Sequence, residues 1–262
     1  MQQRLPKFAR QTRRLLTLLA AAFYGLSQHR YVGRNPSRAA AAEWLHESCA
    51  RGLRAMELQL LVTGQPPERG LIVSNHLSYL DILVLSAAVP CVFVSKAEVE
   101  QWALIGRYAR WAGCVFVRRH DKGDAARANL NVSESLRNGV PIVLFPEGTT
   151  TDGERVLRFH STMLQPAIDA GAAVTPCAIR YELEDGDVGQ EVCWWGDMTL
   201  LPHMRNLLGK RIIRARIAFG EPMLGQGDRK QLSHDLHERV VRLHGRLKSN
   251  EMSTSVAPSR HD

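Results

Sequence analysis

The sequence lacks the closely spaced cysteine and histidine residues from which zinc sites and dense disulfide frameworks are built. Its five cysteines stand far apart, and neither a C-x-x-C pair nor an H-E-x-x-H segment occurs. We therefore expect no metal site and no disulfide framework, and we expect buried, inert thiols in a reducing, cytoplasmic setting. The cysteines are Cys49, Cys91, Cys114, Cys177 and Cys193.

Three glycine-based signatures are also missing. There is no G-x-S-x-G segment, so nothing supports the nucleophile elbow of a serine hydrolase. The dinucleotide-binding pattern G-x-G-x-x-G and the Walker A pattern are absent as well, which removes the usual nucleotide-binding fingerprints.

The N-terminal apolar run is too short to cross a bilayer, since a spanning helix takes about 20 residues. This run, Leu15 to Leu26, follows a basic segment at 10–14. The polar segment at 27–30 stands where a signal peptide needs a small-residue cleavage site. An interfacial helix is the favoured interpretation, with a tilted membrane segment or a core helix as alternatives. We therefore expect residues 1–63 to form an N-terminal helical, membrane-associating region.

Positive charge is in excess, with a formal net charge of +8. This excess favours an anionic partner: nucleic acid, an acidic lipid surface, or a phosphorylated or CoA-bearing substrate. A nucleic-acid-binding chain typically gathers its basic residues with aromatics on one element, whereas the arginines here are scattered. We therefore expect an anionic membrane surface as a partner, and no nucleic acid.

Apolar residues at helical spacing predict a second helix from Ser37 to about Leu61, and short apolar runs begin after the turn signal at 64–67. Because helix-like intervals separate these runs, residues 64–248 are expected to form a single α/β domain with a mostly parallel central sheet flanked by helices. A last helix is expected after Lys230, and a disordered tail at 249–262. The runs are Leu71–Ser74, Cys91–Ser95, Cys114–Val117, Ile142–Phe145, Ala173–Ile179, Val192–Trp195 and Ile212–Phe219.

His76 and Asp81 follow the first of these runs at a spacing of five residues. On one continuous helix they would lie about 140° apart, so they can meet only if His76 is in a loop and Asp81 is in the first turn of a helix. Ser78 supplies the break, as a cap for a helix from about Tyr79 to Ala88. A carboxylate on the second ring nitrogen is typical of a histidine that acts as a general base. Alternatively, Ser78 and Asp81 form a capping box.

Two further segments combine a strand end with groups that bind anions. After Phe145, the chain turns at Pro146-Glu147-Gly148-Thr149-Thr150, where amides and hydroxyls can face an anion or oxyanion. Another strand ends at Arg118 and Arg119, and guanidinium groups bind phosphate in a bidentate manner. Alternatively, the first segment is an ordinary turn without a binding role, and the two arginines are solvent-exposed residues at the end of a strand.

Taken in order, these segments resemble the four-block signature of the glycerolipid acyltransferases, which include 1-acyl-glycerol-3-phosphate acyltransferases. The blocks are N-H-x-x-x-x-D from Asn75, G-x-x-F-V-x-R from Gly113, F-P-E-G-T from Phe145, and an apolar run around Pro176.

The resemblance implies a role for each matching position. His76 is then the general base and Asp81 its orienting partner. Arg119, Glu147, Gly148 and Thr149 hold the phosphate or glycerol part of the acceptor, with Arg118, Phe145 and Thr150 beside them. Pro176 belongs to the block assigned to the acyl donor, where Thr175 and Cys177 depart from the usual apolar pattern.

The activity that follows from the resemblance is acyl transfer from acyl-CoA or acyl-carrier protein to a lysolipid, without metal or cofactor. The leading acceptor is 1-acyl-sn-glycerol-3-phosphate, and the expected location is the cytoplasmic face of the inner membrane. An alternative acceptor is lyso-ornithine lipid or another lysophospholipid, because the segment Glu191 to Leu208 resembles a subgroup with lyso-ornithine-lipid enzymes. A non-catalytic module that binds anionic lipid is the alternative from another class.

Overall fold

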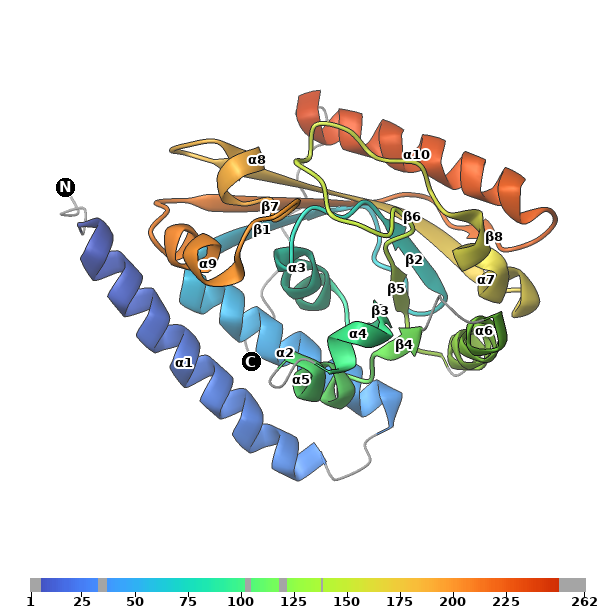
Figure 1. Ribbon diagram of the computed structural model, residues 1–262, viewed down its shortest axis with the longest axis horizontal. Coiled ribbons are helices and arrows are strands. Elements are labelled where there is room, and N and C mark those ends of the chain that lie inside the picture. Colours follow the sequence, from blue (N-terminus) through green and yellow to red (C-terminus); the bar gives the residue numbers. More distant parts are fainter. Residues whose placement is uncertain (1–5, 33–36, 102–104, 118–121, 138, 250–262) are drawn as a thin grey trace.

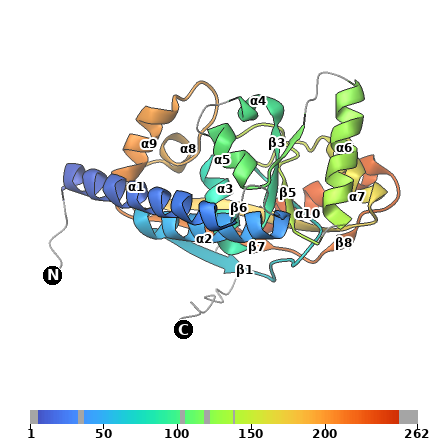
Figure 2. The same ribbon diagram turned by 90° about the horizontal axis from the view of Figure 1, so that it is seen from below.

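The computed structural model describes residues 6–32, 37–101, 105–117, 122–137 and 139–249. Two long helices, α1 (Lys7–Val32) and α2 (Arg38–Met56), come first and pack against each other. The Ser37 hydroxyl accepts the Ala40 amide as the expected cap of α2. Both views place α1 along the outer side of α2 (Figures 1 and 2).

The predicted second helix ends earlier than expected. Glu57 takes a left-handed conformation (φ 55°) that stops α2 at Met56, and Leu58–Thr63 continues as strand β1. Periodicity cannot tell a strand from a helix in so short an apolar run. Leu58–Thr63 is a strand because it pairs with β7 (Ile213–Phe219). The predicted N-terminal region 1–63 therefore includes a strand of the central sheet.

The described residues form an eight-stranded sheet in the order β1-β7-β6-β2-β5-β3-β4, with β8 paired to β6. All pairings are parallel except those of β6 with β7 and with β8, which confirms the mostly parallel sheet. Its other strands are β2 (Leu71–Ser74), β3 (Val92–Lys96), β4 (Val115–Val117), β5 (Ile142–Leu144), β6 (Ala173–Leu183) and β8 (Met223–Leu224).

Helices cover both faces of the sheet, as Figure 1 shows. Within β2, Ile72 belongs to the core on the side of α2 and α3 (Leu80–Ala88), whereas Leu71 and Val73 belong to the core under α10 (Arg229–Ser249). The α/β fold with a sheet flanked by helices is therefore confirmed. The remaining helices are α4 (Ala97–Glu100), α5 (Ile105–Trp111), α6 (Lys122–Arg137), η1 (Ser161–Leu164), α7 (Gln165–Asp169), α8 (Val188–Glu191) and α9 (Leu200–Leu208).

One predicted strand is wrong, and the predicted tail at 249–262 overlaps the last helix by one residue. Val192–Trp195 is a loop between α8 and α9, because its amides bond to Val188 and Leu77 carbonyls rather than to a strand. The expected helix after Lys230 is α10, which ends at Ser249, so the rest of the predicted tail lies outside the described residues.

Helix α1 is held to the domain by a buried arginine and exposes an apolar face on its other side. The guanidinium of Arg14, 2% exposed, donates to the carbonyls of Leu208, Lys210 and Arg211 and to Glu57. Within the described ranges, none of the helices combines the length and apolarity needed to cross a bilayer. The exposed large apolar residues of α1 are Phe8, Leu15, Leu16, Leu19, Phe23, Tyr24 and Leu26.

Candidate active site

His76 lies in the loop directly after β2, at the carboxyl end of the sheet. The preceding residue fixes this loop: the Asn75 amide group donates to Ile179 O at 3.0 Å and accepts the Ile179 N–H at 2.8 Å. Asn75 therefore extends the pairing of β2 with β6 by one residue through its side chain. The loop that carries His76 therefore begins at a buried residue whose side-chain amide is hydrogen-bonded on both its oxygen and its nitrogen.

Asp81 lies in the first turn of α3 and binds His76 as the loop-then-helix prediction requires. His76 Nδ1–H donates to Asp81 Oδ2 at 2.7 Å, and this bond assigns the neutral tautomer that leaves Nε2 as the acceptor. The same Oδ2 accepts the amides of Leu77 at 2.6 Å and Ser78 at 3.0 Å. The same carboxylate therefore orients His76 and forms one half of the predicted capping box, the bond to the Ser78 amide. The Ser78 hydroxyl has no partner among the described residues, so it does not cap α3 as expected.

The loop after β5 lies against His76, because β2 and β5 are parallel neighbours whose carboxyl ends share one edge. The Phe145 ring stacks on the imidazole, with centroids 4.0 Å apart and planes 10° apart. The Thr151 amide donates to His76 O at 3.0 Å. Gly148 takes a φ of 72° in this loop, a conformation that favours glycine.

Glu147 turns into the protein and binds its own main chain. Its Oε1 accepts the His76 amide and its Oε2 the Leu157 amide, each at 3.0 Å. Burial raises the pKa of Glu147 to about 7, although the two amide donors act in the opposite direction. These contacts tie the F-P-E-G-T loop to the loop of His76, and the predicted contact of Glu147 with the acceptor stays a prediction.

The other predicted binding residues are placed in three different ways. Thr149 is exposed and Thr150 half-buried beside the site. Pro176 lies within β6, in register with Val73 and inside the sheet, so its contact with the acyl donor also stays a prediction. Arg118 and Arg119 lie outside the described residues.

The structure adds an aromatic cluster that the sequence did not assign to the site. The Tyr79 hydroxyl lies 3.1 Å from His203 Nδ1, and His203 Nε2 lies 3.0 Å from Cys193 O. Trp194 packs edge-on against Tyr79, and its amide donates to Leu77 O at 2.8 Å. The loop once predicted to be a strand therefore reaches the residue next to His76.

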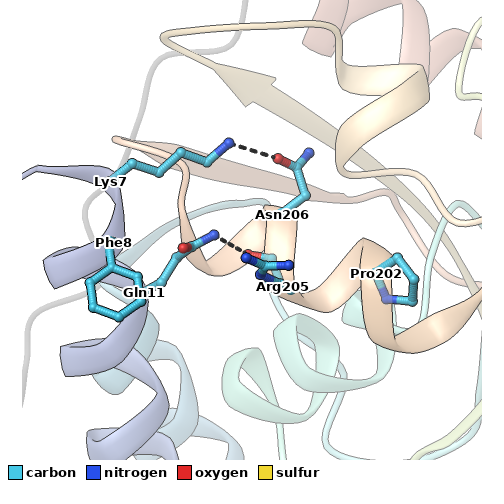
Figure 3. Close-up of a pocket in the computed structure, with 6 residues that line it drawn as sticks. All are labelled: Lys7, Phe8, Gln11, Pro202, Arg205 and Asn206. Carbon is cyan, nitrogen blue, oxygen red and sulfur yellow. Dashed lines mark hydrogen bonds between the residues drawn. The ribbon is translucent and has the colours of Figure 1, made fainter.

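A groove of about 490 Å³ opens elsewhere, between α1 and α9, as Figure 3 shows. None of the predicted catalytic residues lines it. Among the described residues, no three His, Cys, Asp or Glu side chains gather in a way that would hold a metal ion. The residues that line the groove are Lys7, Phe8, Gln11, Pro202, Arg205 and Asn206.

Comparisons with known proteins identify related acyltransferases. The family model described as Acyltransferase matches residues 59–180. A protein of Pseudomonas aeruginosa named lyso-ornithine lipid O-acyltransferase is 38% identical over 75% of this chain and 75% of its own length. A 1-acyl-sn-glycerol-3-phosphate acyltransferase of Neisseria gonorrhoeae is 37% identical over 55% of this chain and 61% of its own.

A solved structure has the same fold. It is the 1-acyl-sn-glycerophosphate (LPA) acyltransferase PlsC from Thermotoga maritima, with a TM-score of 0.64 and 25% identity over 92% of this chain and 98% of that one. These matches confirm the resemblance found in the sequence. The chain therefore belongs to the acyltransferase family of enzymes.

Proposed function

We propose that this enzyme transfers an acyl group from an acyl thioester to the free hydroxyl of a lysolipid, with His76 as the general base. The His76–Asp81 pair is the observation that carries the proposal. Asp81 is fully buried and holds Nδ1, whereas the His76 side chain is 20% exposed. Nε2 has no partner among the described residues, so it is available to a substrate hydroxyl.

The reaction needs no covalent intermediate on the enzyme. His76 Nε2 takes the proton of the acceptor hydroxyl as its oxygen attacks the thioester carbonyl carbon. The tetrahedral oxyanion then expels the thiolate of CoA or of the carrier protein, and the thiolate receives the proton from His76. Asp81 stabilises the imidazolium between these two steps.

The F-P-E-G-T loop is the proposed source of oxyanion donors. The Gly148 amide donates to Phe145 O at 3.2 Å, and the Thr151 amide is taken by His76 O. The amides of Thr149 and Thr150 have no partner among the described residues. We assign these two amides to the oxyanion, since donors in place before reaction stabilise the developing charge.

For the acceptor, we propose lyso-ornithine lipid. The Pseudomonas protein of that name matches 75% of this chain, against 55% for the Neisseria protein named for 1-acyl-sn-glycerol-3-phosphate. The segment Glu191–Leu208 supports this choice, because it resembles the lyso-ornithine subgroup and lies beside the catalytic loop through Trp194 and Leu77. The Neisseria and Thermotoga proteins make 1-acyl-sn-glycerol-3-phosphate the second candidate.

The exposed apolar face of α1 is the proposed contact with the membrane. Leu15, Leu19, Phe23 and Leu26 recur at helical spacing and are 46%, 58%, 76% and 41% exposed. Lys7 and Arg205 line the groove at one end of this helix and suit anionic lipid phosphates. We propose peripheral attachment to the cytoplasmic face of the inner membrane, which would give His76 access to lysolipid there.

Thioester cleavage that depends on an added lysolipid tests the reaction. One acyl-CoA is incubated with lyso-ornithine lipid, with 1-acyl-sn-glycerol-3-phosphate or with lysophosphatidylethanolamine, and free thiol is measured. We expect cleavage with lyso-ornithine lipid at the highest kcat/KM. A higher value with the phosphate acceptor would reverse the choice, and no cleavage with any acceptor, using either acyl-CoA or acyl-carrier protein, would contradict the activity.

His76→Ala tests the catalytic role within the same assay. Loss of the base is expected to lower kcat by at least about a thousandfold, with the fold intact by circular dichroism. The exposed histidine His234 offers a matched control, since His234→Ala removes an imidazole that pairs with Glu238 of the same helix, α10. Activity of His76→Ala within about tenfold of the parent would refute the assignment of His76 as base.

A further inference from the structure

Asp81 has a second buried partner that the four sequence blocks do not include. The Tyr181 hydroxyl donates to Asp81 Oδ1 at 2.7 Å, on the oxygen opposite to the one that holds His76. We propose that Tyr181 is a positioning residue, which holds the Asp81 carboxylate in the orientation that the His76 base requires. This inference rests on the proposed function, whose base it makes more specific.

The course of β6 explains how a residue 100 positions away reaches Asp81. The pairing of β6 with β2 ends at Cys177, opposite Ser74, and β6 then runs on past the end of β2. The two bonds between Asn75 and the Ile179 main chain keep β6 in register over this overhang. Tyr181 follows two residues later on the same face of the strand, against α3.

Asp81 needs such a partner because its terminal torsion is intrinsically loose. Rotation about the bond to a carboxylate has a broad energy profile, so packing alone does not fix its plane. On Oδ2, three donors converge: His76 Nδ1 and the amides of Leu77 and Ser78. A single strong donor on Oδ1 stops the rotation that would turn Oδ2 away from the imidazole.

The Tyr181 hydroxyl is buried beside Asp81 and remains protonated. Its side chain is 1% exposed, and Asp81 is fully buried. Burial, and next the negative charge of Asp81, raise the pKa of Tyr181, so the hydroxyl keeps its proton and remains a donor. A phenylalanine would fill the same space in the core, which means that the hydroxyl itself is the feature to explain.

Tyr181→Phe removes this donor and keeps the ring. We expect kcat to fall about tenfold with KM within about twofold, the size of effect that loss of one hydrogen bond to a charged group produces. The acid limb of the kcat/KM profile should move up by about half a pH unit, since a carboxylate without its Tyr181 donor favours the protonated imidazole more strongly. A purely structural loss would leave the pH profile in place.

Tyr108→Phe is the control, because it removes a tyrosine hydroxyl from a half-buried ring that packs on Trp44 rather than on Asp81. This variant should match the parent in kcat and in pH profile. Thermal unfolding of both variants and the parent measures any common loss of stability.

A titration of His76 by NMR separates this inference from the proposed function, because it needs no substrate. The ring nitrogen signals of His76 in the parent and in Tyr181→Phe are followed against pH. An upward shift of the midpoint in Tyr181→Phe supports the inference even if no lysolipid is acylated. Superimposable titrations would overturn it, as would a kcat of Tyr181→Phe equal to that of Tyr108→Phe.

Discussion

Glu147 joins the two loops of the site through a carboxyl group that is 4% exposed. Because burial raises its pKa from an ordinary 4.5 to about 7, its protonated form is favoured in the folded protein. The stability that this gives is fully present below about pH 4.5 and is lost as the pH rises through about 7. The free energy of unfolding should therefore fall over this pH range because Glu147 ionises.

Glu147→Gln tests this pH dependence, since glutamine has the shape of the protonated acid and does not titrate. The free energy of unfolding of the parent, minus that of the variant, should fall by about 2 kcal/mol between pH 5 and pH 8. Urea unfolding at both pH values measures it, with the exposed Glu68→Gln as the control. A difference that does not change with pH would show that Glu147 stays ionised on its two amide donors.

At the scale of residues, the sequence predicts those contacts that lie within a few positions along the chain. His76 and Asp81 are five residues apart, and local helix geometry was enough to show how they meet. Tyr181 of β6 binds Asp81, and Glu147 in the loop after β5 binds His76, so the register of the sheet decides both partners. Glu147 was identified as a carboxylate in need of a partner, but a main-chain amide of His76 has no sequence signal.

Helix α1 depends on Arg14 for its attachment to the domain. The guanidinium satisfies three carbonyls around the end of α9, and its pKa is lowered by burial despite the bonds to Glu57. Arg14→Ala would leave these carbonyls without their donor in a buried place. We expect a loss of about 3 kcal/mol in the free energy of unfolding and faster hydrogen exchange in α1.

Arg13→Ala is the control that the chain itself offers, because Arg13 binds the same Glu57 from a side chain that is 49% exposed. An ion pair at the surface contributes below about 1 kcal/mol. Equal losses in the two variants, measured by urea unfolding, would mean that the bonds of Arg14 to the carbonyls do not hold α1.

At the scale of elements, the apolar runs of the sequence predict most of the strands. Six of the seven predicted runs are strands, and α10 falls where the last helix was expected. Val192–Trp195 failed because its apolar side chains fill the core from a loop, a use that composition does not distinguish from a strand. Leu58–Thr63 was missed because it follows α2 without a turn signal.

For the molecule as a whole, the sequence predicts the class of fold but not the order of its strands. Periodicity and run length indicate a covered, mostly parallel sheet. The antiparallel pairing of β6 with β7 joins residues such as Cys177 and Phe219, and nothing local specifies it. Its pairing with β7 carries β6 on past the end of β2, and Tyr181 lies in this extension. The contact of Tyr181 with Asp81 therefore depends on the whole sheet.

The same scale decides how the enzyme meets its substrate, because a lysolipid resides in a membrane. Helix α1 lies at the outside of the molecule beside α2 (Figure 2), and its large apolar residues Leu15, Leu19, Phe23 and Leu26 are exposed. Leu19→Glu with Phe23→Glu should weaken binding to vesicles of phosphatidylglycerol and phosphatidylethanolamine by on the order of a hundredfold, since each side chain contributes ~1.5 kcal/mol or more on burial. Cosedimentation with the vesicles measures the partition.

Leu130→Glu on α6 is the control for this pair, because Leu130 is 68% exposed and lies on a helix remote from α1. It should bind vesicles as the parent does. The α1 variant should also acylate a short-chain, water-soluble lysolipid at the parental rate while losing activity on lysolipid held in vesicles, since its His76 site is unchanged. Equal losses on both forms of substrate would place the role of α1 in the fold of the domain rather than at the membrane.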